Sequence, residues 1–145
     1  MRIRACITID APPAAVWADV KHIDRHVEWM RDAESIRFRS SRRTGVGTEF
    51  ECRTRVGPLA TTDVLLVTQW RPRRAIGISH EGAVRGRGRF TLRRARGGRT
   101  RFCWNERLRF PWWMGGPLGE LVAGPLLRCI WKGNLRRLKA RHERD

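Results

Sequence analysis

Apolar and polar residues alternate along most of the chain up to residue 110, which is the period of β-strands. In the first segment Ile3, Ile7 and Ile9 fall on one face, and later segments repeat the pattern between turns marked by Gly and Pro. The alternation predicts seven strands, at residues 2–9, 34–40, 47–56, 60–70, 75–81, 84–94 and 99–110.

Three segments depart from this alternation and predict helices. Residues 10–20 open with Asp10, an N-cap candidate, and with two prolines that suit a first helical turn. Residues 22–30 follow as a second short helix that ends near Trp29. From Gly116 to His142 apolar residues recur at helical spacing, a span of ~40 Å at about 1.5 Å per residue. Because Pro125 lacks a backbone donor, we expect it to kink or split this helix.

The alternation also assigns each strand residue to one face of an antiparallel sheet, which the long helix must cover. The inner face is predicted to hold Phe38, Phe50, Cys52, Val64, Leu66, Ile76, Ile78, His80, Phe90, Leu92, Phe102, Trp104 and Leu108. The helix is predicted to face them with Leu121, Val122, Leu126, Cys129 and Ile130. The outer face then carries a dozen arginines, which a one-residue slip would bury at great cost.

The net charge of +17, from 31 basic and 14 acidic residues, points to an anionic partner such as nucleic acid, a ribosome or a lipid surface. Only three basic residues are lysines, so the arginines also fit biased codon usage and a merely solvated surface, which we favour. The four cysteines lie far apart, and we expect no metal site, no cofactor and no disulfide framework. No apolar run approaches the ~18–20 residues of a membrane span, so the cytoplasm is the expected compartment.

Several motifs, taken in order, resemble one superfamily. They are "APPAAVWADV", Asp24 and Trp29, "GVGTEF", "GGRTRFCW" and "NLRRLKA". Together they are similar to the SRPBCC (START/Bet v 1-like) superfamily, and most of all to its polyketide cyclase/dehydrase and coenzyme Q-binding type. The resemblance implies one domain over residues 1–145 with an α+β helix-grip fold. In this fold a curved antiparallel sheet wraps around the C-terminal helix, with a hydrophobic cavity between them and Trp29 closing one end.

Glu106 and His80 are the chemically unusual residues of the predicted inner face. Glu106 lies in phase between Trp104 and Leu108, where a carboxylate either anchors a ligand or acts as an acid/base with a raised pKa. A structural ion pair with an arginine, or a wet sheet edge, is the simpler interpretation and the one we favour. A lone inward histidine is more often a hydrogen-bonded core residue.

The stretch "FPWWMGGP" (110–117) joins the last strand to the long helix. In the implied fold this junction lies beside the cavity mouth, where Trp112, Trp113 and Met114 line the entrance as a mobile lid or touch an anionic membrane. Packing of both rings on the helix is an equally good interpretation.

Three functions remain open at this stage. The first is a carrier or sensor that binds a quinone, lipid or polyketide-like molecule through the inner-face, helix and lid residues named above. The second is a cyclase/dehydrase-type enzyme that uses Glu106 or His80 as acid/base, which the lack of Tyr and of inward arginines weakens. The third is a ribosome- or RNA-associated protein that uses the arginine face.

Overall fold

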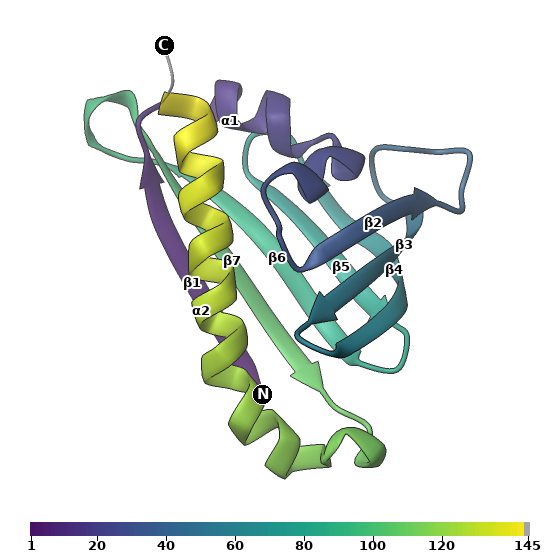
Figure 1. Ribbon diagram of the computed structural model, residues 1–145. Coiled ribbons are helices and arrows are strands. Elements are labelled where there is room, and N and C mark those ends of the chain that lie inside the picture. Colours follow the sequence, from purple (N-terminus) through teal and green to yellow (C-terminus); the bar gives the residue numbers. More distant parts are fainter. Residues whose placement is uncertain (144–145) are drawn as a thin grey trace.

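Seven antiparallel strands form one curved sheet in the computed structural model of the protein, which describes residues 1–143 (Figure 1). The strands are β1 (Arg2–Ile9), β2 (Ala33–Phe38), β3 (Glu49–Val56), β4 (Leu59–Arg71), β5 (Ala75–Glu81), β6 (Arg85–Arg94) and β7 (Thr100–Arg109). Their order across the sheet is β1-β7-β6-β5-β4-β3-β2. Strands β2 to β7 therefore form a meander of hairpins, and β1 pairs with β7.

The remaining elements are helical. They are α1 (Pro13–Val20), the 3-10 helices η1 (Ile23–Glu28), η2 (Arg96–Gly98) and η3 (Trp112–Met114), and α2 (Gly116–Glu143). The long helix α2 lies along β1 and β7, and η1 packs on β2 (Figure 1). This arrangement confirms the expected α+β helix-grip fold. No helix in the described part of the chain is both long and apolar enough to cross a bilayer.

Helix α1 begins later than its sequence suggests. Pro12 is the N-cap and Pro13 the first helical residue, so Asp10 does not cap this helix as predicted. Two consecutive prolines, each with φ fixed near the helical value, place the first turn after Asp10. The backbone N–H of Asp10 instead donates to Glu143 Oε2 at the end of α2, at 2.8 Å.

The predicted inner face is correct for most strands but wrong for β4. Leu65 and Val67 are buried there, whereas Val64 and Leu66 are only half-buried on the opposite face. Four consecutive apolar residues give no alternation from which the phase can be read. The pairing of Phe50 with Leu65 places Leu65 beside the inner residues of β3.

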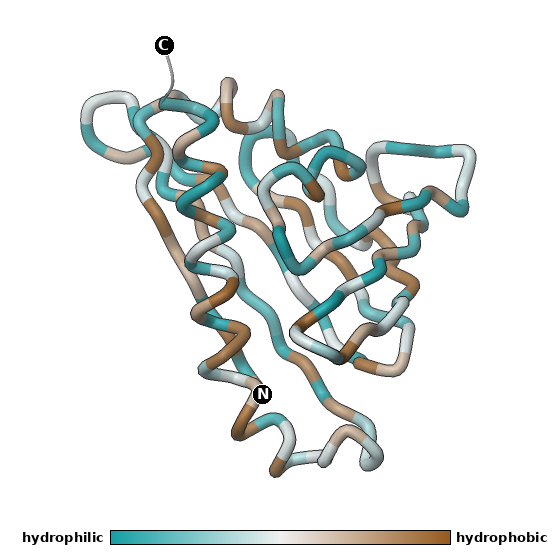
Figure 2. Tube along the Cα trace, viewed as in Figure 1, coloured by the Kyte–Doolittle hydropathy of each residue, from teal (hydrophilic) through white to brown (hydrophobic). Residues whose placement is uncertain are grey.

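Helix α2 is continuous through Pro125, and its first turns lie at an angle to the rest (Figure 1). Trp131, Leu135 and Leu138 in its second half are buried against the sheet. The first half contains many apolar residues, brown in the lower helix of Figure 2. They fall in two stripes, and Ala123 and Leu127 of one stripe line the cavity. Leu121, Val122 and Cys129, predicted to face the sheet, lie on the exposed stripe.

Cys6 and Cys103 are directly opposite each other on β1 and β7 and form a disulfide. The expectation that the cysteines form no disulfide is therefore wrong for this pair. Their separation of 97 positions in the sequence hides the fact that the first and last strands are neighbours. Cys52 and Cys129 are free thiols.

Candidate functional site

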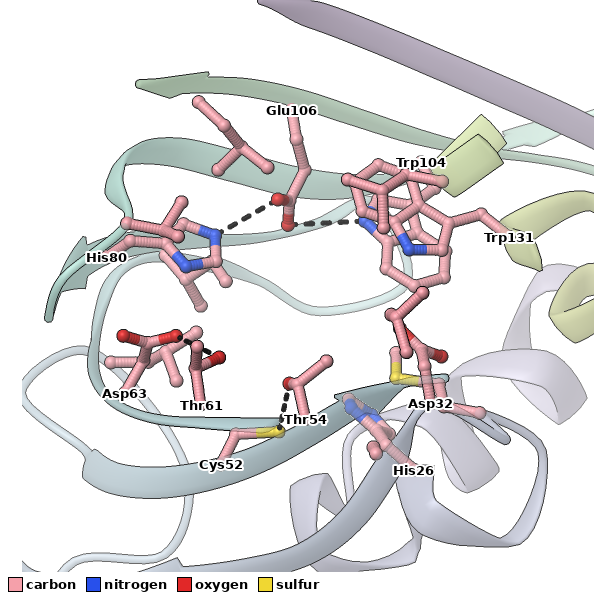
Figure 3. Close-up of a pocket in the computed structure, with 18 of the residues that line it drawn as sticks. His26, Asp32, Cys52, Thr54, Thr61, Asp63, His80, Trp104, Glu106 and Trp131 are labelled. Atoms are coloured by element: carbon pink, nitrogen blue, oxygen red, sulfur yellow. Dashed lines mark hydrogen bonds and ion pairs between the residues drawn. The ribbon is translucent and has the colours of Figure 1, made fainter. Parts of the chain in front are cut away.

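A cavity of about 350 Å³ lies between the inner face of the sheet, η1 and α2. Most of its wall is apolar, and the stacked rings of Trp104 and Trp131, 4.4 Å apart at an angle of 8°, form one side (Figure 3). Trp104 comes from β7 and Trp131 from α2, so the stack joins sheet and helix across the cavity. The cavity has the size and the wall chemistry of a small-molecule site.

A buried polar cluster interrupts this apolar wall. His80 Nε2 lies 3.0 Å from Glu106 Oε2, and the indole N–H of Trp104 donates to Glu106 Oε1 at 3.3 Å (Figure 3). Glu106 is only 5% exposed, and these two partners provide hydrogen bonds to its buried oxygens. Its inward position is as the alternation predicts, but its partner is a histidine and not the arginine that we favoured.

Two glycines of β6 allow His80 and Glu106 to meet. His80 on β5 pairs with Gly86, and Glu106 on β7 pairs with Gly88, so β6 lies between the two side chains. A Cβ at Gly88 would overlap the carboxylate of Glu106. The side-chain-free backbone of β6 therefore opens the space through which the imidazole and the carboxylate make contact.

The pKa of His80 is raised above its ordinary value of 6.5. Burial disfavours the imidazolium, but the carboxylate of Glu106, its hydrogen bond and the charge of Asp63 together outweigh burial. The carboxylate of Glu106 thus favours the charged form of an imidazole that lies in the cavity wall.

Two other titratable groups of the cavity stay uncharged near neutrality. Burial lowers the pKa of His26 to about 4, against the opposing effect of its 2.7 Å hydrogen bond with the Val20 carbonyl. Burial also raises the pKa of the Cys52 thiol to about 11. Of the two wall histidines, His80 is thus the one whose pKa is shifted toward the charged form.

Asp63 is a second buried carboxylate in the wall, 7% exposed. Its Oδ1 accepts the backbone N–H of Ala83 at 3.1 Å, and its Oδ2 accepts the hydroxyl of Thr61 at 3.3 Å. Both partners are uncharged. The side chain lies on the same side of the cavity as His80 (Figure 3).

The structure brings eleven of the predicted ligand-binding residues to the cavity wall. They are Phe50, Cys52, Ile76, Ile78, His80, Phe90, Trp104, Glu106, Leu108, Met114 and Leu126. These residues lie at the inward positions of β3 and β5–β7, and on η3 and α2.

The other predicted residues lie elsewhere. Trp29, Leu92 and Phe102 are buried in the core, where Trp29 packs on Phe90, Phe102 and Trp104, and Ile130 packs against the same core. Phe38 packs beside Phe50 outside the wall, and Val64 belongs to the other face of β4. Trp112, Trp113, Leu121, Val122 and Cys129 are exposed to solvent, Trp112 by 87%.

Sequence reasoning missed a large share of the wall. The missed residues are Ile23, His26, Met30, Asp32, Ala33, Ile36, Thr54, Val56, Leu59, Thr61, Asp63, Leu65, Val84, Arg89, Phe110, Ala123, Leu127 and Trp131. For Asp63 a signal exists: the two-residue turn Gly57-Pro58 pairs Val56 with Leu59, and counting back along the hairpin pairs Cys52 with Asp63.

Comparison with known proteins gives one family and several related folds. The family model described as "Polyketide cyclase / dehydrase and lipid transport" matches residues 1–143. No curated protein matches the chain.

Three solved structures share the fold. A protein from Thermus thermophilus is 18% identical with a TM-score of 0.81, over 97% of this chain and 96% of that one. XoxI from Bacillus cereus is 13% identical with a TM-score of 0.76, over 97% and 94%. A Nitrosospira multiformis protein is 14% identical with a TM-score of 0.73, over 98% and 96%. At these identities the likeness concerns the fold alone.

Proposed function

The chain belongs to the polyketide cyclase/dehydrase and lipid transport family, and on that premise we propose that it carries or senses a quinone, lipid or polyketide-like molecule held in its cavity. The family and the helix-grip fold support a hydrophobic small-molecule ligand in general. The observation that carries the proposal is the cavity of about 350 Å³, whose wall is mostly apolar and includes a few polar side chains. A ligand that fills it gains about 25 cal/mol for each Å² of apolar surface removed from water.

Filling the cavity tests this proposal directly. Ala123 lies in the wall on α2, and its neighbour Val122 is 77% exposed. We expect Ala123→Phe to weaken binding of the fluorescent probe N-phenyl-1-naphthylamine at least about tenfold, because the ring occupies the ligand's space. Val122→Phe is the matched control and keeps wild-type affinity. Equal affinity in both variants contradicts the proposal.

Mass spectrometry of an organic extract of the natively purified protein identifies the ligand class. A stoichiometric hydrophobic compound supports the carrier function. An empty extract together with no probe binding contradicts it.

The contact between His80 and Glu106 favours a second candidate, acid–base catalysis of the cyclase/dehydrase kind. An imidazole with a raised pKa, 3.0 Å from a buried carboxylate in the cavity wall, has the features of a general acid–base pair. Glu106→Gln removes the charge and keeps the shape. Catalysis is supported if Glu106→Gln no longer converts the extracted compound but binds the probe as the wild type does. If the wild-type protein leaves the compound chemically unchanged, the protein acts as a carrier alone.

The exposed apolar residues near the cavity support loading at a membrane. Trp112, Leu118, Leu121 and Val122 are each at least 75% exposed, and they adjoin Met114 and Leu126 of the cavity wall. Tryptophan favours the membrane interface, and a chain of charge +17 is attracted to anionic lipid such as that of the cytoplasmic leaflet. We favour a membrane over RNA or a ribosome as the anionic partner, because polyanion binding alone needs no exposed apolar stripe.

A further inference from the structure

The charges inside the cavity have the opposite sign to those of the surface. Asp32, Asp63 and Glu106 lie in the wall of a protein whose net charge is +17. Arg89 also belongs to the wall, but it is exposed and alternates along β6 with the buried Gly88 and Phe90. The interior therefore offers a ligand hydrogen-bond acceptors and negative charge. The imidazole of His80, whose pKa is raised, faces the same cavity.

Asp63 differs from the other two carboxylates. Glu106 is matched by His80, and Asp32 is half-buried and accepts the amide N–H of Asn134 at 2.7 Å. Asp63 is more than nine-tenths buried, and within residues 1–143 it accepts only from the Thr61 hydroxyl and the Ala83 N–H. A carboxylate has about four acceptor positions, so roughly two of them remain for a ligand.

A buried carboxylate without a cationic partner is held at considerable cost in free energy. A ligand donor placed against Asp63 offsets this cost, whereas a ligand carboxylate or phosphate would add a second negative charge in the same low-dielectric space. Gly82 lets the carboxylate lie close to the β5–β6 turn, since a Cβ there would overlap Asp63. The backbone is thus shaped around this group.

We propose that the cavity selects hydrophobic molecules with a hydrogen-bond-donating or cationic end, an amine or a hydroxyl, that binds Asp63, and that it rejects hydrophobic carboxylates. This selection presupposes the hydrophobic ligand binding proposed above. The polar end lies against Asp63, Thr61 and His80, and the apolar body extends to the stacked Trp104 and Trp131 on the other side (Figure 3).

Three molecules with the same apolar chain test the selection: decylamine, decanol and decanoate. Each competes with N-phenyl-1-naphthylamine for the cavity, in about 0.15 M salt to screen the surface arginines. We expect decylamine to bind at least about tenfold more tightly than decanoate, the effect of one charge-assisted hydrogen bond. The positive surface favours decanoate, so a preference for the amine must come from the cavity.

The variants Asp63→Asn and Asp24→Asn distinguish the effect of a charge in the cavity from the effect of a charge on the surface. Both remove one negative charge, but Asp24 is exposed and pairs with Arg43. The amide oxygen that Asp63→Asn introduces can still accept the Ala83 N–H, so the turn keeps its support. In Asp63→Asn we expect the preference for decylamine over decanoate to fall about tenfold, with decanol changed less than about twofold. Asp24→Asn keeps the wild-type preference.

The outcomes distinguish the two proposals. The selection by Asp63 is overturned if decanoate binds as tightly as decylamine, or if Asp63→Asn and Asp24→Asn show the same preference. Binding of decanol in these cases still supports a hydrophobic cavity. Failure of all three molecules and of the probe to bind overturns the proposed function itself.

Discussion

At the scale of single residues, burial and neighbouring charge decide which groups of the cavity are ionised. His26 and His80 both lie in the wall, yet the pKa of His26 is lowered and that of His80 raised. His26 packs on the rings of Trp29 and Phe90 and forms a hydrogen bond with a carbonyl, whereas His80 contacts a carboxylate. Neighbouring charge, and not residue type, therefore gives the two histidines opposite pKa shifts.

The lowered pKa of His26 makes the fold sensitive to acid. The unfolded chain takes up a proton at His26 near pH 6.5, while the folded protein resists it down to about 4. The stability that neutral His26 contributes is complete above pH 6.5 and is lost as the pH falls toward 4. When the pH falls from 7 to 5, we expect the free energy of unfolding of the wild-type protein to decrease by about 2 kcal/mol more than that of His26→Gln, as measured by urea unfolding. The control His22→Gln should lose as much stability as the wild type. If His26→Gln loses the same amount as the wild type, His26 is not the source of the acid sensitivity.

The contact between His80 and Glu106 depends on the missing side chain at Gly88. In Gly88→Ala the new methyl group must displace the Glu106 carboxylate, so we expect a loss of about 1–3 kcal/mol in the free energy of unfolding. The pKa of His80 should then fall, because burial remains and the carboxylate has moved away. NMR titration of the imidazole measures this, with Gly133→Ala in α2, where the Cβ has ordinary room, as the control. An unchanged His80 titration in Gly88→Ala would contradict the proposed geometry.

At the scale of elements, the sequence predicts where the strands begin and end better than it predicts which side of an element faces the core. Strand ends agree within about two residues because alternation and turn residues both mark them. Alternation also finds Glu106 and His80 at inward positions. It fails in β4, where an unbroken apolar run hides the phase and Asp63 turns inward against the usual preference of a carboxylate.

For a related reason, the sequence did not predict which side of the first half of α2 faces the sheet. Two apolar stripes exist there, and helical spacing alone does not say which of them the sheet covers. Leu127 and Ala123 continue the buried stripe of Trp131, while Leu118 and Val122 form the other. Only tertiary packing separates the two stripes.

Pro125 gives α2 a measurable weak point. It lies inside the helix and cannot donate to the carbonyl of Leu121. We expect Pro125→Ala to raise the free energy of unfolding by about 1–3 kcal/mol in urea denaturation, since the position is exposed and the donor is restored. Pro117→Ala is the control, because proline in the first turn suits a helix and its removal brings no gain. The same gain in both variants would show that Pro125 does not weaken the helix.

At the scale of the whole molecule, charge and apolar surface are separated. The outer face of the sheet is covered by exposed arginines of β2, β3, β6 and β7, while apolar side chains of η3 and the first half of α2 face solvent near the cavity. Three carboxylates, those of Asp32, Asp63 and Glu106, lie in the cavity wall. This separation fits the proposed loading at a membrane. The arginines would attract the protein to anionic lipid headgroups, and the apolar side chains would contact the bilayer. The cavity would then hold a ligand whose polar end is cationic or hydrogen-bond-donating, opposite in charge to the headgroups.

Membrane contact through the apolar end predicts a specific pattern of vesicle binding. We expect co-sedimentation with vesicles of phosphatidylcholine and phosphatidylserine, and weaker binding as salt rises, because charge attracts the protein to the surface. Trp112→Ala combined with Trp113→Ala should reduce partitioning about tenfold or more, since both rings are exposed beside the cavity. Val46→Ala, an exposed apolar residue in the β2–β3 loop, is the control. If the double variant partitions like the wild type, or if RNA binds tightly and abolishes vesicle binding, the arginine face alone accounts for the association and loading at a membrane is excluded.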